Sequence, residues 1–204
     1  MNIYKYLSKK KSSGKGFTMI ELVVSAGILV VITLVVLVKQ SAFGGNVLVG
    51  ALAYDVGLSI RQAQVFGLSV REFGAGTGMF NIGYGVHFDI DNPTSYQLFV
   101  DMDKNKTFNT NDGTKEVFSI SRGFSIAQIC GTTVSSVELC SNTGNITTLD
   151  ITFIRPDPDA FIRIDGDAAT VYKSARIVVQ SPQGKKREVT VESTGQISIS
   201  QTQI

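Results

Sequence analysis

The sequence predicts an α+β protein in which a long N-terminal helix, apolar enough in its first half to cross a membrane, packs on an antiparallel β-sheet domain. Residues 17–38 contain a single charged side chain, that of Glu21. Residues 48–66 repeat apolar side chains at helical spacing, and from residue 80 onward apolar and polar residues alternate as they do in strands. One helix followed by strands alone places the helix against the sheet.

The composition excludes several classes of function. Hydrophobic residues make up 43% of the 204 residues, which suffices for a core. The net charge is +2, but residues 1–16 hold five lysines and no acid, so the remainder lacks the basic excess of a nucleic-acid-binding protein. With one histidine and no glycine-rich phosphate loop, the sequence carries no signature of an enzyme.

The apolar residues 17–38 have the length of a bilayer span. As a helix they would measure about 33 Å, against about 30 Å of hydrocarbon. The preceding lysines leave the N-terminus in the cytoplasm and send the chain from Ser41 onward across the membrane. A secretory signal would be shorter and end in a small-residue cleavage site. A plain anchor explains the length but not Glu21, because a carboxylate in hydrocarbon is costly and usually functional.

The residues around Glu21 resemble a known processing signal. After the lysine-rich leader comes the run GFTMIEL, from Gly16 to Leu22. This run is similar to the class III signal of type IV pilins and type II secretion pseudopilins. The resemblance implies that a prepilin peptidase cuts between Gly16 and Phe17, that Phe17 is N-methylated, and that the helix stays in the product.

The same resemblance implies a pilin fold and a structural role. The partners would be other pilin subunits and an inner-membrane assembly platform, and the subunit would move from the membrane lipid into a filament. There the carboxylate of Glu21 would meet the terminal amine of Phe17 on a neighbouring subunit. Either charge alone in an apolar filament core is penalised, so pairing favours one register. An unprocessed single-pass anchor for an extracytoplasmic module is the alternative.

The pattern after the span predicts an amphipathic continuation of the helix over residues 39–67. Its apolar row is expected at Leu48, Leu52, Val56, Ser59 or Ile60, Ala63 and Phe66. A β-rich globular domain is expected over residues 68–204. Its strands are expected in the segments MFNIGYGVHFDI, SYQLFVDM, KEVFSI, TLDITFI, FIRI, ARIVVQ, REVTVES and GQISIS, with His87 on a solvent-facing side.

Two longer segments are similar to minor pilins of the GspH/FimT type. These are SIRQAQVFGLSV after the span and ARIVVQSPQGKKREVTVESTGQISIS near the end. The resemblance implies a minor subunit. Some FimT-like pilins take up DNA through C-terminal basic residues. The resemblance therefore makes Lys185, Lys186 and Arg187 a candidate DNA-binding site, with Lys173 and Arg176 nearby. The alternative is a solubilising basic turn, since aromatic stacking partners are scarce there.

The two cysteines, Cys130 and Cys140, have no histidine or further cysteine nearby to complete a zinc site. Outside the cytoplasm a disulfide that closes the loop between them is favoured, and two buried free thiols are the alternative.

The stretch DMDKNKTFNTND is a candidate calcium loop. Its side-chain oxygens at alternate positions resemble the start of an EF-hand loop. Lys106 stands where that loop has its glycine, and an aspartate replaces the glutamate, so a solvated turn is the alternative. The expected ligands are Asp101, Asp103, Asn105, Thr107 and Asp112.

Overall fold

The computed structural model describes residues 16–69, 73, 78, 80–144 and 146–201, apart from the side chains of residues 38–44. Except for Gly16, the expected leader lies outside these residues. The chain forms two compact units, Met1–Ser41 and Ala42–Ile204, and the helix α1, Met19–Leu68, contributes to both. Each unit is described by itself.

The first unit contains the apolar half of α1. Valine and isoleucine are frequent in it, although β-branched side chains lower helix propensity in water. In hydrocarbon the backbone must satisfy its own hydrogen bonds, and a helix does this within one segment. The segment is therefore suited to a helix in an apolar surrounding.

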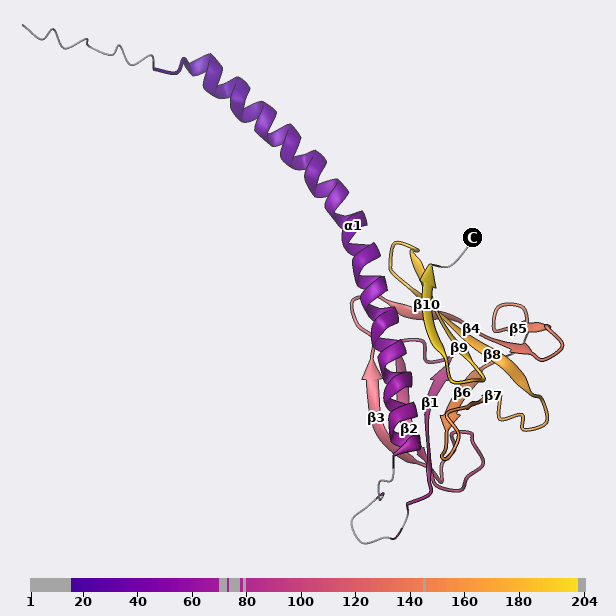
Figure 1. Ribbon diagram of the computed structural model, residues 1–204. Coiled ribbons are helices and arrows are strands. Elements are labelled where there is room, and N and C mark those ends of the chain that lie inside the picture. Colours follow the sequence, from indigo (N-terminus) through magenta and orange to yellow (C-terminus); the bar gives the residue numbers. More distant parts are fainter. Residues whose placement is uncertain (1–15, 70–72, 74–77, 79, 145, 202–204) are drawn as a thin grey trace, which may run out of the picture. The chain divides into compact units, whose positions relative to one another are not determined.

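In the part of the second unit that the structure describes, the rest of α1 is accompanied by ten strands in two antiparallel sheets (Figure 1). The sheet with the order β3-β2-β1-β6-β7 is formed by β1 (Gly83–Asp89), β2 (Ser95–Asp101), β3 (Gly113–Ser119), β6 (Thr148–Phe153) and β7 (Ala160–Ile164). The sheet with the order β10-β9-β8-β4-β5 is formed by β4 (Ser125–Thr133), β5 (Glu138–Cys140), β8 (Tyr172–Gln180), β9 (Lys186–Glu192) and β10 (Ile197–Gln201). The α+β class is confirmed, but the strands are divided between two sheets where one was expected.

One face of α1 belongs to a core shared by both sheets (Figure 1). The buried residues of this face follow one another at intervals of four and three positions, which places them on one side of the helix. The row differs from the expected one at its start, where Leu48 is 39% exposed and Leu52 is only partly buried. The buried residues of the row, at most 1% exposed, are Val49, Ala53, Val56, Ile60 and Ala63.

The strands β4 and β5 were not expected from the sequence. In β4 both Ile126 and Ile129 are buried in the core, although residues three apart should face opposite sides of a sheet. The register against β8 shifts between Ile126 and Gln128, which is a β-bulge. The bulge hides the alternation by which β4 could have been recognised.

The end of α1 lies directly against β6. A Cβ atom at Gly67 would lie 2.4 Å from the carbonyl oxygen of Phe153, so only glycine allows this approach. The carbonyl of Gly67 accepts a hydrogen bond from the backbone N–H of Arg155 (3.1 Å). The next residues close the helix, as the N–H of Ser69 donates to the carbonyl of Val65 (3.0 Å).

Candidate functional sites

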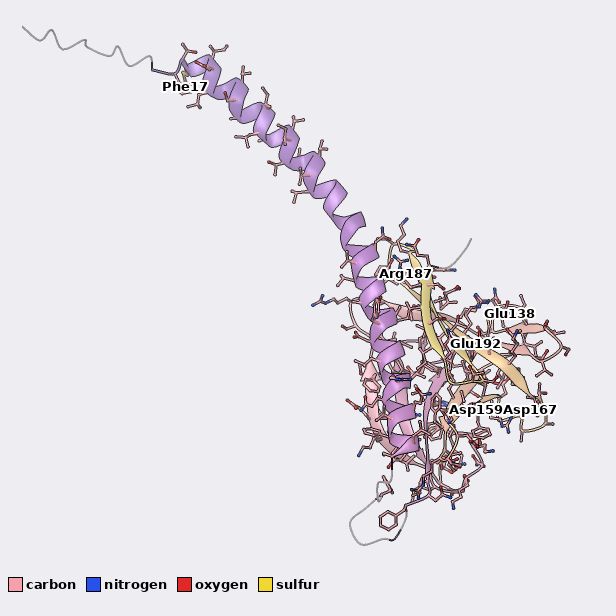
Figure 2. All side chains as sticks on the ribbon, viewed as in Figure 1. Phe17, Glu138, Asp159, Asp167, Arg187 and Glu192 are labelled. Atoms are coloured by element: carbon pink, nitrogen blue, oxygen red, sulfur yellow. A yellow bond between two sulfur atoms is a disulfide. The ribbon has the colours of Figure 1, made fainter. Side chains whose placement is uncertain are left out.

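The apolar segment Met19–Leu37 is long and apolar enough to cross a bilayer, a property that signal sequences share. None of it is buried against the other described residues. Among the residues that the structure describes, these side chains therefore cover no core of their own chain. At its start the ring of Phe17 is 78% exposed, and Figure 2 shows it at the N-terminal end of the helix. An apolar surface of this length must be covered by lipid or by other protein.

The first turn of α1 is capped by Thr18. Its hydroxyl accepts a hydrogen bond from the backbone N–H of Glu21 (3.3 Å), and its carbonyl accepts one from the N–H of Leu22 (3.1 Å). A threonine followed three residues later by a glutamate has the spacing of a capping box. The acid also lies at the positive end of the helix dipole. The Glu21 side chain does not complete the box, so its local contribution is the interaction of its charge with the helix dipole.

The hydroxyl groups of the segment are satisfied within the helix. Ser25 donates to the carbonyl of Glu21 (2.7 Å), and Thr33 donates to the carbonyl of Leu29 (2.8 Å). The carboxylate of Glu21 is exposed, and no hydrogen bond or ion pair joins it to any residue that the structure describes. The single charged side chain of the segment Met19–Leu37 therefore has no partner among the described residues.

The part of α1 in the second unit also has an outward apolar row. Val47, Tyr54, Leu58 and Val65 are between 55% and 68% exposed. They recur at intervals of seven, four and seven residues, which keeps them on one side of the helix, opposite the core-facing row. Both faces of this half of the helix are therefore apolar, and one of them is free to contact another protein.

The loop between β2 and β3 brings three of the five expected calcium ligands together. Carboxylate oxygens of Asp101, Asp103 and Asp112 lie within 4.8 Å of one another. Asp101 is fully buried, and its carboxylate accepts hydrogen bonds from the backbone N–H groups of Asn105 and Lys106 (both 3.1 Å). Burial raises the pKa of Asp101 to about 6. The negative charge of Asp112 also raises this pKa, whereas the hydrogen bond from the backbone of Lys106 lowers it. Such a cluster has the oxygen donors that a hard cation takes.

The other two expected ligands are engaged with each other. The side-chain oxygen of Asn105 accepts hydrogen bonds from the backbone N–H and the hydroxyl of Thr107 (2.7 and 2.8 Å). Lys106, at the position of the EF-hand glycine, adopts φ 68° and so makes the left-handed turn without glycine. The loop therefore makes this turn without glycine, while its own hydrogen bonds use part of the set of oxygen ligands.

His87 was expected to face solvent, but the structure shows it largely buried. Its side chain is 13% exposed, and Nδ1 lies 2.6 Å from a carboxylate oxygen of the buried Asp150. The ring of Phe108, from the β2–β3 loop, covers it at 4.7 Å between centroids. Burial raises the pKa of Asp150, and the hydrogen bond with His87 opposes this. The pair anchors the loop to the outer face of the sheet.

Cys130 and Cys140 face each other across β4 and β5, with sulfur atoms 2.07 Å apart, the distance of a disulfide. Both are buried, and the structure agrees with the favoured alternative. Arg176 of β8 lies beside them and pairs with Glu138 (2.6 Å) and Glu188 (3.4 Å). Its charge is therefore already balanced.

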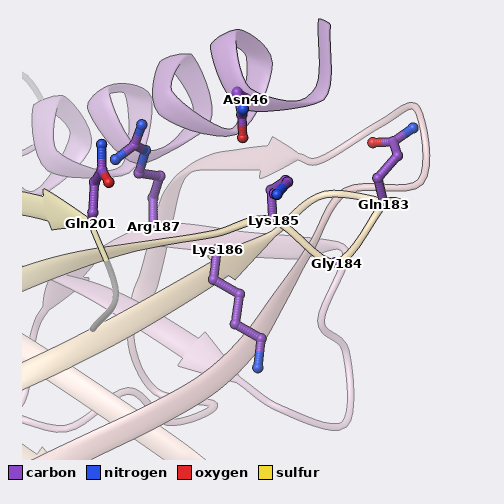
Figure 3. A pocket seen from close by; sticks show the side chains of 7 residues that line it. All are labelled: Asn46, Gln183, Gly184, Lys185, Lys186, Arg187 and Gln201. Carbon is purple, nitrogen blue, oxygen red and sulfur yellow. The ribbon is translucent and has the colours of Figure 1, made fainter. Parts of the chain in front are cut away.

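The β8–β9 hairpin brings Lys185, Lys186 and Arg187 to one pocket of about 590 Å³ (Figure 3). Asn46 of α1 and Gln201 of β10 line it with them. Neither Lys173 nor Arg176, which were expected nearby, lines the pocket. The lining residues also include no aromatic side chain on which a base could stack.

No protein-family model, no curated protein and no solved structure matches the chain. The residues themselves must therefore carry any functional assignment. Each unit contains candidate functional sites. The first unit has the apolar segment with Glu21, and the second unit has the carboxylate cluster of the β2–β3 loop and the basic pocket of the β8–β9 hairpin.

Several of these contacts could not be seen in the sequence. The pairing of His87 with Asp150 joins residues 63 positions apart, and Asn46 reaches the basic hairpin from another element. The cap at Thr18 is different, because threonine followed by glutamate at the third position is a readable signal. Attention to helix capping would have found it.

Proposed function

We propose that the chain is a structural subunit, of the minor pilin or pseudopilin kind, of a type IV pilus or a type II secretion pseudopilus. A prepilin peptidase would cut between Gly16 and Phe17, and N-methylation of Phe17 would follow. The subunit would wait in the cytoplasmic membrane, with its second unit on the extracytoplasmic side, and assemble through α1. Other pilin subunits and the assembly platform would be its partners.

The observation that carries this proposal is the open carboxylate of Glu21. The hydroxyls of Ser25 and Thr33 are bonded inside the helix, whereas no described residue pairs with this acid. A carboxylate in hydrocarbon is costly and persists where it has a function. The terminal amine of Phe17 on a neighbouring subunit has the charge and the position in the helix to compensate it, which would select one axial register.

The outward row of α1 supports the same role. Val47, Tyr54, Leu58 and Val65 would remain in water on an isolated second unit. Packing beside the helix of a neighbouring subunit would bury them, at about 25 cal/mol per Å² of apolar surface. The proposal therefore gives an occupant to both exposed apolar surfaces of α1.

The test is a Glu21→Val variant expressed with the filament machinery of its host. We expect it to insert and to be cleaved, but to be recovered in filaments at a small fraction of the wild-type amount. Ser25→Ala is the matched control one turn later, since its hydroxyl bonds only its own helix. Mass spectrometry should find methylated Phe17 at the N-terminus of both. A chain that begins at Met1 would identify an unprocessed anchor, and normal incorporation of Glu21→Val would refute the pairing.

A further inference from the structure

The basic pocket of the β8–β9 hairpin is formed at the edge of the core. In β9 Val189 and Val191 are buried in the core that also contains the buried row of α1. Arg187 continues their row beyond the core, because alternate residues share a face of a strand, and Lys185 directly precedes the strand. Figure 3 shows both basic side chains on the side of the helix, whereas Lys186 points to the opposite side. All three basic residues line the pocket, but only the side chains of Lys185 and Arg187 lie on the side of the helix.

The cations of the pocket are not neutralised by the acids that the structure describes. The salt bridges among these residues involve His87 and Arg176, and none involves Lys185 or Arg187. Glu188, the nearest acid along β9, lies on the other face of the strand and bonds Arg176 and the hydroxyl of Ser200. The pocket thus carries a net positive charge, which favours an anionic ligand.

The polar rim of the pocket adds neutral hydrogen-bonding groups. Asn46 of α1 and Gln201 of β10 place side-chain amides beside the cations. The register pairs Arg187 directly with Gln201, which holds these two residues side by side. A ligand with one anionic centre and adjacent hydroxyl groups would match this set of donors and acceptors.

Chain connectivity limits the distance between the pocket and the apolar segment. A Cβ atom at Gly45 would lie 2.6 Å from the side-chain oxygen of Gln183, so the hairpin contacts α1 at this residue. Gly45 follows Leu37, the last residue of the apolar segment, by eight positions. Eight residues span at most about 28 Å in any conformation. The contact between the hairpin and α1 therefore lies no more than about 28 Å from the end of the segment, whatever the arrangement of the two units.

We propose that this pocket binds the phosphate of an anionic phospholipid in the extracytoplasmic leaflet. Lys185 and Arg187 donate charge-assisted hydrogen bonds to the phosphate, and the amides of Asn46 and Gln201 bind hydroxyl groups of a phosphatidylglycerol-type headgroup. The inference rests on the proposed function only in requiring the apolar segment to lie in a membrane. It gives the waiting subunit a second attachment to the bilayer, which must be released on assembly.

The test is lysine footprinting of the full-length chain in bilayer discs. An amine-reactive reagent and mass spectrometry measure the reactivity of each lysine in discs of phosphatidylcholine alone and in discs that also contain phosphatidylglycerol. We expect phosphatidylglycerol to lower the reactivity of Lys185 about fivefold, from the attraction of one basic side chain to an anionic headgroup. Lys186, on the opposite face, and Lys173, toward the other end of β8, should change much less.

Two variants separate the pocket from general surface charge. Arg187→Gln should remove most of the protection of Lys185, whereas Lys186→Gln, its neighbour on the other face, should leave it in place. Equal protection of all three lysines would refute the pocket and indicate diffuse attraction. No protection of Lys185 in discs that contain the chain would refute the inference and leave the filament proposal intact. A chain that fails to enter the discs would refute both.

Competing anions complete the test in phosphatidylcholine discs. Free inorganic phosphate and a short DNA duplex should protect Lys185 less than phosphatidylglycerol does. Stronger protection by free phosphate would assign the pocket to a soluble anion. Stronger protection by the duplex, falling steeply with salt, would assign it to nucleic acid; either result overturns the lipid proposal.

Discussion

The side-chain amide of Gln64 in α1 donates a hydrogen bond to the carbonyl of Gly195, 131 residues further along the chain (3.1 Å). The same amide reaches the carbonyl of Pro158 (3.2 Å), and Gln64 is only 5% exposed. Gly195 is in the turn between β9 and β10, whereas Pro158 precedes β7. One helix side chain therefore ties together loops that belong to the two sheets.

We predict that Gln64→Ala lowers the free energy of unfolding by about 2 kcal/mol, because it leaves two carbonyls without their donor in a buried place. Denaturant unfolding of the full-length chain in mild detergent measures it. Gln62→Ala is the matched control, since this half-buried neighbour has no hydrogen bond to either loop, and it should change stability by less than about 0.5 kcal/mol. Equal stability of the two variants would show that the amide does not hold the loops.

A second prediction concerns pH. The pKa of Asp101 is raised to about 6 by burial, so the folded chain holds a proton that the unfolded chain has released. Between about pH 4 and pH 6 the native state binds more protons, and stability must fall as the pH rises through this window. The pKa values of Asp112 and Asp150 are also raised by burial and act in the same direction, whereas the hydrogen bond from Asn109 lowers the pKa of Asp103, which acts in the opposite direction and mainly below about pH 4.

The loss assigned to Asp101 is of the order of 2 kcal/mol. Unfolding experiments on the full-length chain at a series of pH values, without divalent cations, measure the slope. Asp101→Asn should flatten it, and Thr110→Ala, an exposed change in the same loop, should not. A chain that becomes more stable from pH 4 to pH 6 would contradict the raised pKa.

Local patterns allowed much of the fold to be predicted. Helical spacing after residue 48 and strict alternation, as at Val86 and Phe88, identified α1 and most strands, because these periods follow from backbone geometry alone. The division into two sheets depends on pairings between distant segments, such as β1 with β6, which no local pattern encodes. The bulge in β4 removed the one local signal that this strand had.

The candidate sites divide along the same line. The acids of the β2–β3 loop are close in sequence, and the loop brings the carboxylates of three of them together. Gln64 is a buried polar residue, and its partners come from loops far along the chain. Buried polar groups need specific partners, and the partners of His87 and Gln64 become visible only in the folded chain.

Calcium binding by the β2–β3 loop stays a prediction, and pH offers a sharp test of it. The cluster of Asp101, Asp103 and Asp112 supplies hard oxygen ligands, and loops of extracellular modules bind calcium with dissociation constants of about 0.1–1 mM. Isothermal titration of the full-length chain at pH 7 should detect this binding. Asp103→Asn should weaken it strongly, whereas Asp91→Asn, which removes an exposed carboxylate from the β1–β2 turn, should not.

Proton competition then connects the ion to the buried acid. A ligand must be deprotonated to bind, and with a pKa of about 6 Asp101 is largely protonated at pH 5. Lowering the pH from 7 to 5 should therefore weaken calcium binding about tenfold. Added calcium should also reduce the loss of stability between pH 4 and pH 6, because the ion stabilises the ionised carboxylate in the folded state. No heat at millimolar calcium would leave the loop as a turn held by its own hydrogen bonds, and binding that is equally tight at both pH values would place the ion away from Asp101.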